Sequence, residues 1–413
     1  MIQTFRGTHD HLPEMALRID HIIKVAQQWA GLYGYDLVQT PIFEYAEVFL
    51  RSLGETSDIV SKEMFSFQDR HGETLILRPE GTAGLMRALL SHHLTHQLPQ
   101  KFFYAGPMFR YERPQKGRAR QFHQIGIEFL GESAPTADGE VIAAGWDILG
   151  ALGLQDKVTL HINSLGDTSS RAHYRQCLIE YFSPFKEDLS PESQERLQKN
   201  PLRILDSKDP RDQAFVAKAP QLSDSLNEES KTFFNEVLET LHTLKIPYHV
   251  NPHLVRGLDY YSHTIFEFVT DLLGAQGTVL AGGRYDGLSL MMGHKEAIPS
   301  LGWAAGLERL EMMMEAPIRI VRPLSLIPIG PEAERYMGEL AQSLRHEGLK
   351  VMVAHTGNLK ARMKYANRIN ASHVILFGND ELQKECVIVK NLDTGEQHEL
   401  SLAALVPHIK VLS

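Results

Sequence analysis

The sequence predicts an α+β protein with a small α/β domain at its C-terminal end. Two observations lead to this prediction. In the larger N-terminal part, helical and extended patterns follow one another in no regular order, whereas beyond "EAPIRIVRP" short apolar runs alternate with helices. With 413 residues, the chain is also long enough for two or three domains, each with its own core.

The N-terminal part begins with a helix and continues into strands. Pro13 stands where a helix begins, and apolar residues recur at helical spacing up to Gly34. The extended segment "YDLVQTPIFEY" follows, then "ETLILRPEGT", a strand that ends in a turn, and a helix over about residues 83–90. "QKFFYAGPMFRYE" and "FHQIGIEFLG" have the pattern of two strands, which predicts a hairpin with a long, charged tip.

After the strand "KVTLHIN" the pattern changes. Residues 167–245 are polar and helix-like, which predicts a helical insertion between two parts of one domain, residues 1–166 and 246–320. Strand patterns resume with "YSHTIFEFV" and "GTVLAGGRYDGL", and "PSLGWAAGLERLEMMM" predicts a strand passing into a helix. Residues 323–413 show a β-α-β-α-β order with Gly348 as a helix C-cap, then a hairpin and a last helix.

Composition excludes several classes of protein. A hydrophobic fraction of 43% and a charged fraction of 23% are typical of a globular chain, and no apolar run approaches the ~20 residues of a membrane span. The start "MIQTFRGTHDHLP" does not resemble a secretory signal, so we expect a cytoplasmic protein with no membrane partner. Cys177 and Cys386 are too few for a disulfide framework. The histidines of "HDH" and "SHHLTH" lack neighbouring ligands and are expected at the surface or in caps.

Basic residues concentrate in two stretches, although the net charge is −9. The loop "MFRYERPQKGRARQFHQ" carries four arginines and one lysine against a single acid, Glu112. Such runs are usually solvated surface. Here Arg110 ends an apolar strand and Phe122 starts the next, so a phosphate could meet guanidinium groups and a base could stack on the ring. The second stretch, residues 350–368, contains no acid at all.

Three further motifs could form a pocket. In "LRPEGTAG", Glu80 lies in a turn where its carboxylate could hold an ammonium group, although an acid at an ordinary helix start is also common. In "LVRGLDYYSHTIFEF", the two tyrosines suit a small pocket, but they could equally be core residues at a strand edge. In "GWAAGLERL", Arg309 emerges near a helix start. The sequence contains no P-loop, and "AGGRYDGL" is only a weak glycine-rich turn.

Together these motifs resemble those of class II aminoacyl-tRNA synthetases, and specifically the histidyl-tRNA synthetase family of bacterial type. "RPEGTAG", the loop stretches "RPQKGR" and "RQFHQ", and "LVRGLDYY" carry the resemblance; the last is similar to a signature peculiar to the histidine enzymes. "GLERL" resembles the third general motif of the class, and the first helix with "TPIFE" the first. The resemblance implies a catalytic domain on a six-stranded antiparallel sheet, a C-terminal anticodon-binding domain and a homodimer.

The resemblance also implies an activity and a set of site residues. The chain would activate L-histidine with ATP and Mg²⁺ and transfer it to the 3′ end of tRNA(His), with Arg256 and Arg110 at the reacting phosphate. The histidine site would comprise Glu80, Gly81, Thr82, Gln124, Glu128, Tyr260 and Tyr261, and Glu128 would accept an imidazole N–H. ATP would contact Arg110, Glu112, Phe122 and Arg309. The tRNA would contact Arg113, Gln115, Lys116, Arg118 and Arg120 and, in the terminal domain, Lys360, Arg362 and Lys364. No metal cage made of protein ligands alone is implied.

The chain departs from the family pattern at two positions, Ala119, where an aromatic residue is expected, and Trp303, where phenylalanine is usual; both concern packing more than chemistry. Three other functions remain open. They are a histidine-binding regulatory paralogue that does not charge tRNA, a synthetase for another amino acid, and a plain nucleic-acid-binding module. Paralogues of that kind typically lack the terminal domain and the catalytic arginines, which this chain keeps.

Overall fold

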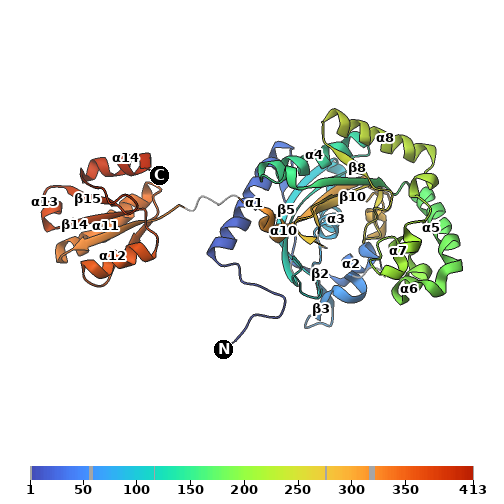
Figure 1. The fold of residues 1–413 in the computed structure, drawn as a ribbon, viewed down its shortest axis with the longest axis horizontal. Helices are drawn as coiled ribbons and strands as arrows, with labels where there is room; N and C mark the ends of the chain where they lie inside the picture. Colours follow the sequence, from blue (N-terminus) through green and yellow to red (C-terminus); the bar gives the residue numbers. More distant parts are fainter. Residues whose placement is uncertain (1, 55–58, 116, 275–276, 316–320, 413) are drawn as a thin grey trace. The chain divides into compact units, whose positions relative to one another are not determined.

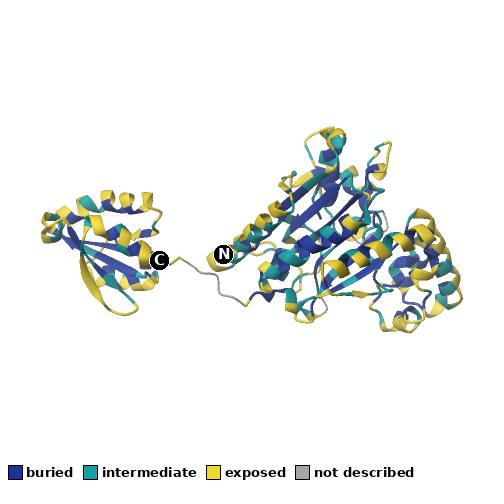
Figure 2. Cartoon of the chain, turned by 90° about the horizontal axis from the view of Figure 1, so that it is seen from above, coloured by how far each residue is buried: buried dark blue, intermediate teal, exposed yellow. Residues whose placement is uncertain are grey.

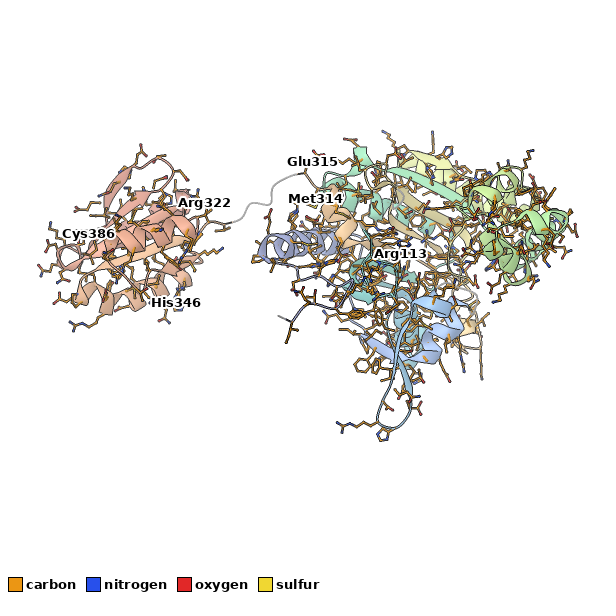
Figure 3. All side chains as sticks on the ribbon, turned by 60° about the horizontal axis from the view of Figure 1, so that its bottom comes forward. Arg113, Met314, Glu315, Arg322, His346 and Cys386 are labelled. Carbon is orange, nitrogen blue, oxygen red and sulfur yellow. The ribbon has the colours of Figure 1, made fainter. Side chains whose placement is uncertain are left out.

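The computed structural model describes residues 2–54, 59–115, 117–274, 277–315 and 321–412. The chain divides into two compact units, Met1–Ala316 and Pro317–Ser413, and each has its own apolar core. Met314 and Glu315 lie at the end of the first unit and Arg322 near the start of the second (Figure 3). In the described part of the chain, no helix combines the length and the apolarity that crossing a membrane requires.

A mixed sheet of eight strands forms the centre of the first unit (Figure 1). In spatial order, the strands are β1 (Asp36–Leu37), β5 (Gln100–Phe109), β6 (Gln121–Leu130), β11 (Ser300–Gly306), β10 (Thr278–Arg284), β9 (Ser262–Val269), β7 (Thr159–Ser164) and β8 (Tyr248–Val250). The six central strands are antiparallel, whereas β1 and β8 pair in parallel with β5 and β7. The prediction of six antiparallel strands therefore missed the two edge strands, β1 and β8. They have only two and three residues, which are too few to show an alternation of apolar and polar side chains.

The predicted basic hairpin is confirmed by the pairing of β5 with β6. Their register is continuous from Gln100 opposite Leu130 to Phe109 opposite Gln121. Because successive side chains of a strand point to opposite faces, Ile125 and Ile127 join one core while Gln124 and Glu128 lie on the other face. The charged tip of the hairpin thus lies beside a sheet face that carries polar side chains.

Helices cover the sheet on both faces. One core packs α1 (Pro13–Leu32), α4 (Pro135–Ala151), α8 (Glu228–Thr243) and α10 (Leu307–Met313) against the strands. A second core contains α2 (Ala46–Leu53), α3 (Thr82–Ser91) and α9 (Leu288–Met291). The predicted first helix is confirmed as α1, whose buried face contains Ile19, Ile22, Ala26 and Ala30. Figure 2 shows the central strands of the large sheet as mostly buried and the outer helix faces as exposed.

Between β7 and β8 the chain is helical, as the polar pattern predicts. Its helices are α5 (Thr168–Phe182), α6 (Pro191–Lys199), α7 (Pro210–Val216) and α8, and short 3₁₀ turns such as Pro201–Ile204 connect them. The helices α5, α6 and α7 gather at one side of the first unit (Figure 1). A separate three-stranded sheet orders β2 (Phe43–Tyr45), β4 (Thr74–Leu77) and β3 (Phe65–Gln68).

The second unit has the predicted β-α-β-α-β order followed by a hairpin and a helix. Its sheet contains, in spatial order, β13 (Val351–Val353), β12 (Leu324–Ile329), β14 (His373–Gly378), β15 (Cys386–Asn391) and β16 (Gln397–Ser401). The helices are α11 (Pro331–His346), α12 (Leu359–Arg368), α13 (Asn379–Gln383) and α14 (Leu402–Leu412). Gly348 follows Glu347, the C-cap residue of α11, and has a φ of 82°, which fits the prediction that a glycine ends this helix.

Candidate active site

A cavity of about 600 Å³ lies on the polar face of the large sheet. Side chains from the hairpin, from β10 and β11, and from the segments before α3 and β9 line it. Many of the predicted site residues share this cavity: Glu80, Thr82, Arg110, Glu112, Gln115, Arg118, Phe122, Gln124, Arg256, Tyr260, Tyr261 and Arg309. Residues far apart in the sequence are therefore brought together by the fold.

The cavity wall at the start of α3 is held by Glu80. Its buried carboxylate accepts hydrogen bonds from the backbone N–H groups of Thr82 (2.6 Å) and Ala83 (2.8 Å), so it caps the helix from inside the protein. Burial raises the pKa of Glu80, and the two N–H donors oppose this shift. Gly81 does not line the cavity; a Cβ there would lie 2.4 Å from the ring of Tyr104, so only glycine fits.

Glu128 lies directly beneath the cavity and is 1% exposed. Its carboxylate accepts a 2.6 Å hydrogen bond from Thr82 Oγ1 and another from the hydroxyl of Tyr285. Burial raises the pKa of Glu128 to about 8, although both hydrogen bonds act in the opposite direction. The carboxylate needs the space left by Gly302, where a Cβ would lie 1.9 Å from Glu128 Oε2. An acid in this position can accept a proton or an N–H group from a bound ligand.

Three tyrosines form an aromatic wall of the cavity. The ring centroids of Tyr260 and Tyr261 are 4.7 Å apart, and those of Tyr260 and Tyr285 are 5.6 Å apart. Tyr285 was not among the predicted site residues, because "AGGRYDGL" has the pattern of a weak glycine-rich turn. In the structure, β10 ends at Arg284 and places Tyr285 in the pocket. The position of Tyr285 at a strand end is the signal that could have identified it.

Arginines give the other end of the cavity a positive charge. The guanidinium of Arg110 lies 5.2 Å from the ring centroid of Phe122, and its Nε donates to the carbonyl of Pro79 at 2.9 Å. Arg118 Nε lies 3.1 Å from Glu112 Oε2. Arg309 donates to the carbonyls of Gly117 (3.2 Å) and Thr278 (2.6 Å), and burial, together with the nearby Arg118, lowers its pKa. Clustered cations of this kind are suited to an anion with several charges.

Arg256 lies beside the tyrosines, with its guanidinium 5.6 Å from the ring centroid of Tyr261. Its NH1 group is 3.5 Å from the carboxylate of Glu267, a β9 residue that the sequence analysis did not single out. Among the residues that the structure describes, Arg256 Nε and Gln124 Oε1 are buried without a hydrogen-bond partner. Both side chains line the cavity, so a bound ligand could satisfy these two atoms.

His11, His123 and Glu308 form a cluster at the cavity wall that the sequence analysis also missed. His123 Nδ1 lies 2.8 Å, and His11 Nε2 3.9 Å, from Glu308 Oε1. Two imidazoles and a carboxylate could hold a divalent metal ion. The expectation that the "HDH" histidines are surface or capping residues is wrong for His11, because the chain before α1 folds against the hairpin and places this partly buried side chain in the cavity.

The remaining hairpin residues lie away from the cavity lining. Arg113 is exposed on the loop (Figure 3). Arg120 packs its guanidinium 3.7 Å from the ring centroid of Tyr111 and 5.4 Å from that of Phe5, so it anchors the N-terminal segment to the loop. Lys116 falls outside the described residues.

In the second unit, the three predicted basic residues differ in exposure. Lys360 and Lys364 are exposed on α12. Arg362 is 7% exposed, donates to the carbonyl of Pro328 and pairs with Glu334. The guanidinium of Arg362 is already bound by the carbonyl of Pro328 and the carboxylate of Glu334. Its geometry therefore favours a role in stabilising this unit over direct contact with a ligand.

This chain is similar to proteins of one family over nearly its whole length. Residues 7–167 and 189–310 match the family model described as histidyl-tRNA synthetase, and residues 324–412 match the model described as anticodon binding domain. The chain is 53% identical over 412 residues to the histidine–tRNA ligase of Gluconacetobacter diazotrophicus, covering 100% of this chain and 99% of that one. It is also 53% identical over 405 residues to the histidine–tRNA ligase of Rhodospirillum rubrum, covering 98% of this chain and 97% of that one. The structure of apo histidyl-tRNA synthetase from S. aureus aligns with a TM-score of 0.83 at 35% identity and covers 99% of both chains.

Proposed function

Because the chain belongs to the histidyl-tRNA synthetase family, we propose that it activates L-histidine with ATP and transfers the histidyl group to the 3′ end of tRNA(His). The observation that carries this proposal is a single cavity lined by the buried Glu80 and by tyrosines on one part of its wall and by clustered arginines on another. The buried Glu128 is bonded to the lining residues Thr82 and Tyr285. An amino acid and a polyphosphate can therefore bind side by side, as adenylate formation requires.

The acidic end is suited to histidine. Glu80 presents a buried carboxylate for the α-ammonium group, and Thr82 lies beside it. Glu128 would accept the imidazole N–H, with Tyr285 and Thr82 holding its carboxylate in place. Gln124, whose Oε1 has no partner in the described structure, supplies a further acceptor. Selectivity would follow, because an amino acid without such a donor forgoes the hydrogen bond to the buried acid.

The arginine end is suited to ATP, which binds as a substrate with Mg²⁺ on its phosphates. Phe122 and Glu112 would contact the adenine, with Arg110 and Arg309 on the phosphates and ring. The carboxylate of histidine attacks the α-phosphorus, pyrophosphate leaves, and the acyl group then moves from the adenylate to a ribose hydroxyl of the tRNA. Arg256 would stabilise the charge that develops on the α-phosphate, so no protein nucleophile is needed.

Two surfaces would bind the tRNA. Arg113, Gln115, Arg118 and Arg120 belong to the hairpin loop at the cavity and would meet the acceptor end, as would Lys116. In the second unit, which matches the anticodon-binding family, Lys360 and Lys364 present exposed ammonium groups to an RNA backbone. Because the protein would contact both the acceptor end and the anticodon, it would transfer histidine only to a tRNA that carries the correct anticodon.

A homodimer in the cytoplasm completes the proposal. Large apolar side chains are exposed on the small sheet, among them Phe43 at 53%, Tyr45 at 61% and Phe67 at 44%. Apolar patches of this kind are typical of protein interfaces, and the patch includes Phe43 of the "TPIFE" stretch. The two cysteines, Cys177 and Cys386, are both free, as expected in a reducing compartment.

The test is ATP–pyrophosphate exchange measured with each of the twenty amino acids in the absence of tRNA. Exchange that depends on histidine alone is the expected result, because only histidine pairs with Glu128. A folded protein that binds histidine without exchange would instead be the regulatory paralogue. That alternative is disfavoured by relatives 53% identical that are named as ligases. Exchange with another amino acid would contradict the assignment of the pocket.

A further inference from the structure

The segment Leu254–Tyr261, which contributes Arg256 and two tyrosines to the cavity, has no helix or strand of its own. It runs between β8 and β9, so the ladder hydrogen bonds that hold a strand do not hold it. Its position must therefore be fixed by contacts with other parts of the protein.

Three of these contacts come from the helical insertion. Arg171 NH1 donates to the carbonyl of Tyr261 at 2.9 Å, and Arg203 NH2 donates to the carbonyl of Gly257 at 3.3 Å. In addition, Asn200 Nδ2 donates to Asp259 Oδ1 at 2.9 Å. The donors thus reach the segment from its middle, at Gly257, to its end, at Tyr261.

Arg171 is the most firmly placed of the three donors. It lies in the first turn of α5, whose start is fixed by the side chain of Asp167 accepting from the backbone N–H of Ser170 at 2.8 Å. Burial lowers the pKa of Arg171, while the negative charge of Asp259 opposes that shift. The guanidinium therefore interacts with the segment through a hydrogen bond and through charge.

Apolar packing joins the same two regions. Tyr174 and Leu178 of α5 share one buried core with Tyr260 and Tyr261. On the other side of the segment, a Cβ on Gly54 would lie 2.2 Å from Asp259 Oδ2, so Asp259 has little room to move. A displacement of the insertion would consequently be transmitted to the tyrosines that line the cavity.

We infer that the helical insertion acts as a clamp on the segment Leu254–Tyr261, with Arg171 as the main positioning residue. The inference rests on the proposed function and adds a role for the insertion: its placement sets the affinity of the cavity for the amino acid. Arg171 does not line the cavity, so it acts through Tyr261.

The experiment compares Arg171→Ala, Arg171→Lys and the control Arg175→Ala in the full-length protein. Arg175 is exposed on the same helix one turn later. The measurements are the Kd for histidine by calorimetry, the KM values for histidine and ATP in pyrophosphate exchange, the fraction of active sites by titration, and the thermal midpoint. We expect Arg171→Ala to raise the Kd and KM for histidine about tenfold, the scale of one lost charge-assisted hydrogen bond, with the KM for ATP nearly unchanged. Arg171→Lys should recover part of the loss.

The outcomes separate the clamp from a purely structural role and from the proposed function. A lower active fraction or thermal midpoint with an unchanged KM for histidine would overturn the clamp, as would an equal effect of Arg175→Ala. If the unmodified protein shows no histidine-dependent exchange, the proposed function fails, whatever the variants do. If it shows exchange and Arg171→Ala retains its histidine affinity, only the clamp fails.

Discussion

Thr82 Oγ1 donates a 2.6 Å hydrogen bond to Glu128 Oε1, and this contact joins the start of α3 to the central sheet beneath the cavity. The same carboxylate accepts from Tyr285 at the end of β10. Glu128 is therefore held by the two polar groups that flank the proposed histidine site. Its ionisation should affect both the stability of the protein and the binding of the substrate.

The first prediction concerns stability and Glu128→Gln. Burial raises the pKa of Glu128 to about 8 in the folded protein, from an ordinary value of 4.5. Because the folded state holds this proton more tightly, the group stabilises the fold at low pH, and that contribution is lost as the pH rises from about 4.5 to about 8. Glutamine carries no such proton. The thermal midpoint of Glu128→Gln minus that of the original protein should therefore increase as the pH rises from 5 to 9. The variant should bind histidine more weakly than the original protein at every pH.

Differential scanning calorimetry and histidine titrations across this pH range check the prediction. Glu236→Gln is the matched control, since Glu236 is exposed on α8 and should show no such trend. A stability difference that stays flat or falls with pH would contradict the raised pKa.

The second prediction concerns Arg256→Ala. If Arg256 stabilises the charge on the α-phosphate, its loss should lower the rate of adenylate formation roughly 10²- to 10³-fold, by analogy with the removal of an oxyanion-hole donor. Single-turnover kinetics measure this step directly. Arg256→Lys keeps the positive charge but loses the planar guanidinium, so its rate of adenylate formation should lie between those of the original protein and Arg256→Ala. A folded Arg256→Ala protein with near-normal rates would remove Arg256 from the mechanism.

The third prediction concerns Gly81→Ala. An added Cβ would lie 2.4 Å from two ring atoms of Tyr104, so either the ring or the start of α3 must move. We expect a loss of about 1–3 kcal/mol in the free energy of unfolding and a higher KM for histidine, because Thr82 follows directly. Gly31→Ala in α1 meets nothing within 4 Å and should be neutral or slightly stabilising. Equal effects of the two variants in urea unfolding would rule out this packing argument.

Local sequence patterns predict much of this fold and site. The basic hairpin, the first helix and the alternation of the second unit follow from period and turn residues, which act over short distances. Glu80 was identifiable because a turn at the end of a strand can place a side chain in a cleft, whereas Arg256 was predicted from the family resemblance. The residues that motif reasoning selected were therefore those whose local context already set them apart.

The remaining features depend on tertiary contacts between residues far apart in the sequence, which local patterns indicate weakly or not at all. Tyr285 gains its importance from Glu128, which is 157 residues away in sequence. His11 lies near His123 only because the N-terminal segment folds against the hairpin. Arg362 resembled a surface residue by charge, yet it shares the buried face of α12 with Ala366, and this spacing of four was the available signal.

The fourth prediction compares basic residues of α12. Lys360→Ala combined with Lys364→Ala should weaken tRNA binding without changing the thermal stability of the protein. The plot of log K for tRNA binding against log salt concentration should become less steep, by the amount that roughly two lost phosphate contacts contribute. Arg362→Ala should instead destabilise the second unit by about 1–3 kcal/mol, because Glu334 and the carbonyl of Pro328 lose their buried partner. Filter binding at several salt concentrations and thermal unfolding distinguish the two. Unchanged tRNA affinity in the double lysine variant would show that this helix is not an RNA surface.

The last prediction separates the two chemical steps by removing the chain beyond Pro323. The first unit has its own cores and the whole cavity, so pyrophosphate exchange should be largely retained. Transfer to tRNA should fall much further, because the contacts proposed between the second unit and the anticodon region would be lost and the KM for tRNA would rise. Exchange and aminoacylation, measured on the same preparation and normalised to its active-site titre, give the comparison. Circular dichroism of the truncated protein serves as the folding control. An equal loss of both steps from a folded protein would mean that the second unit supports the active site itself, and that the two units do not divide adenylate formation and tRNA recognition between them.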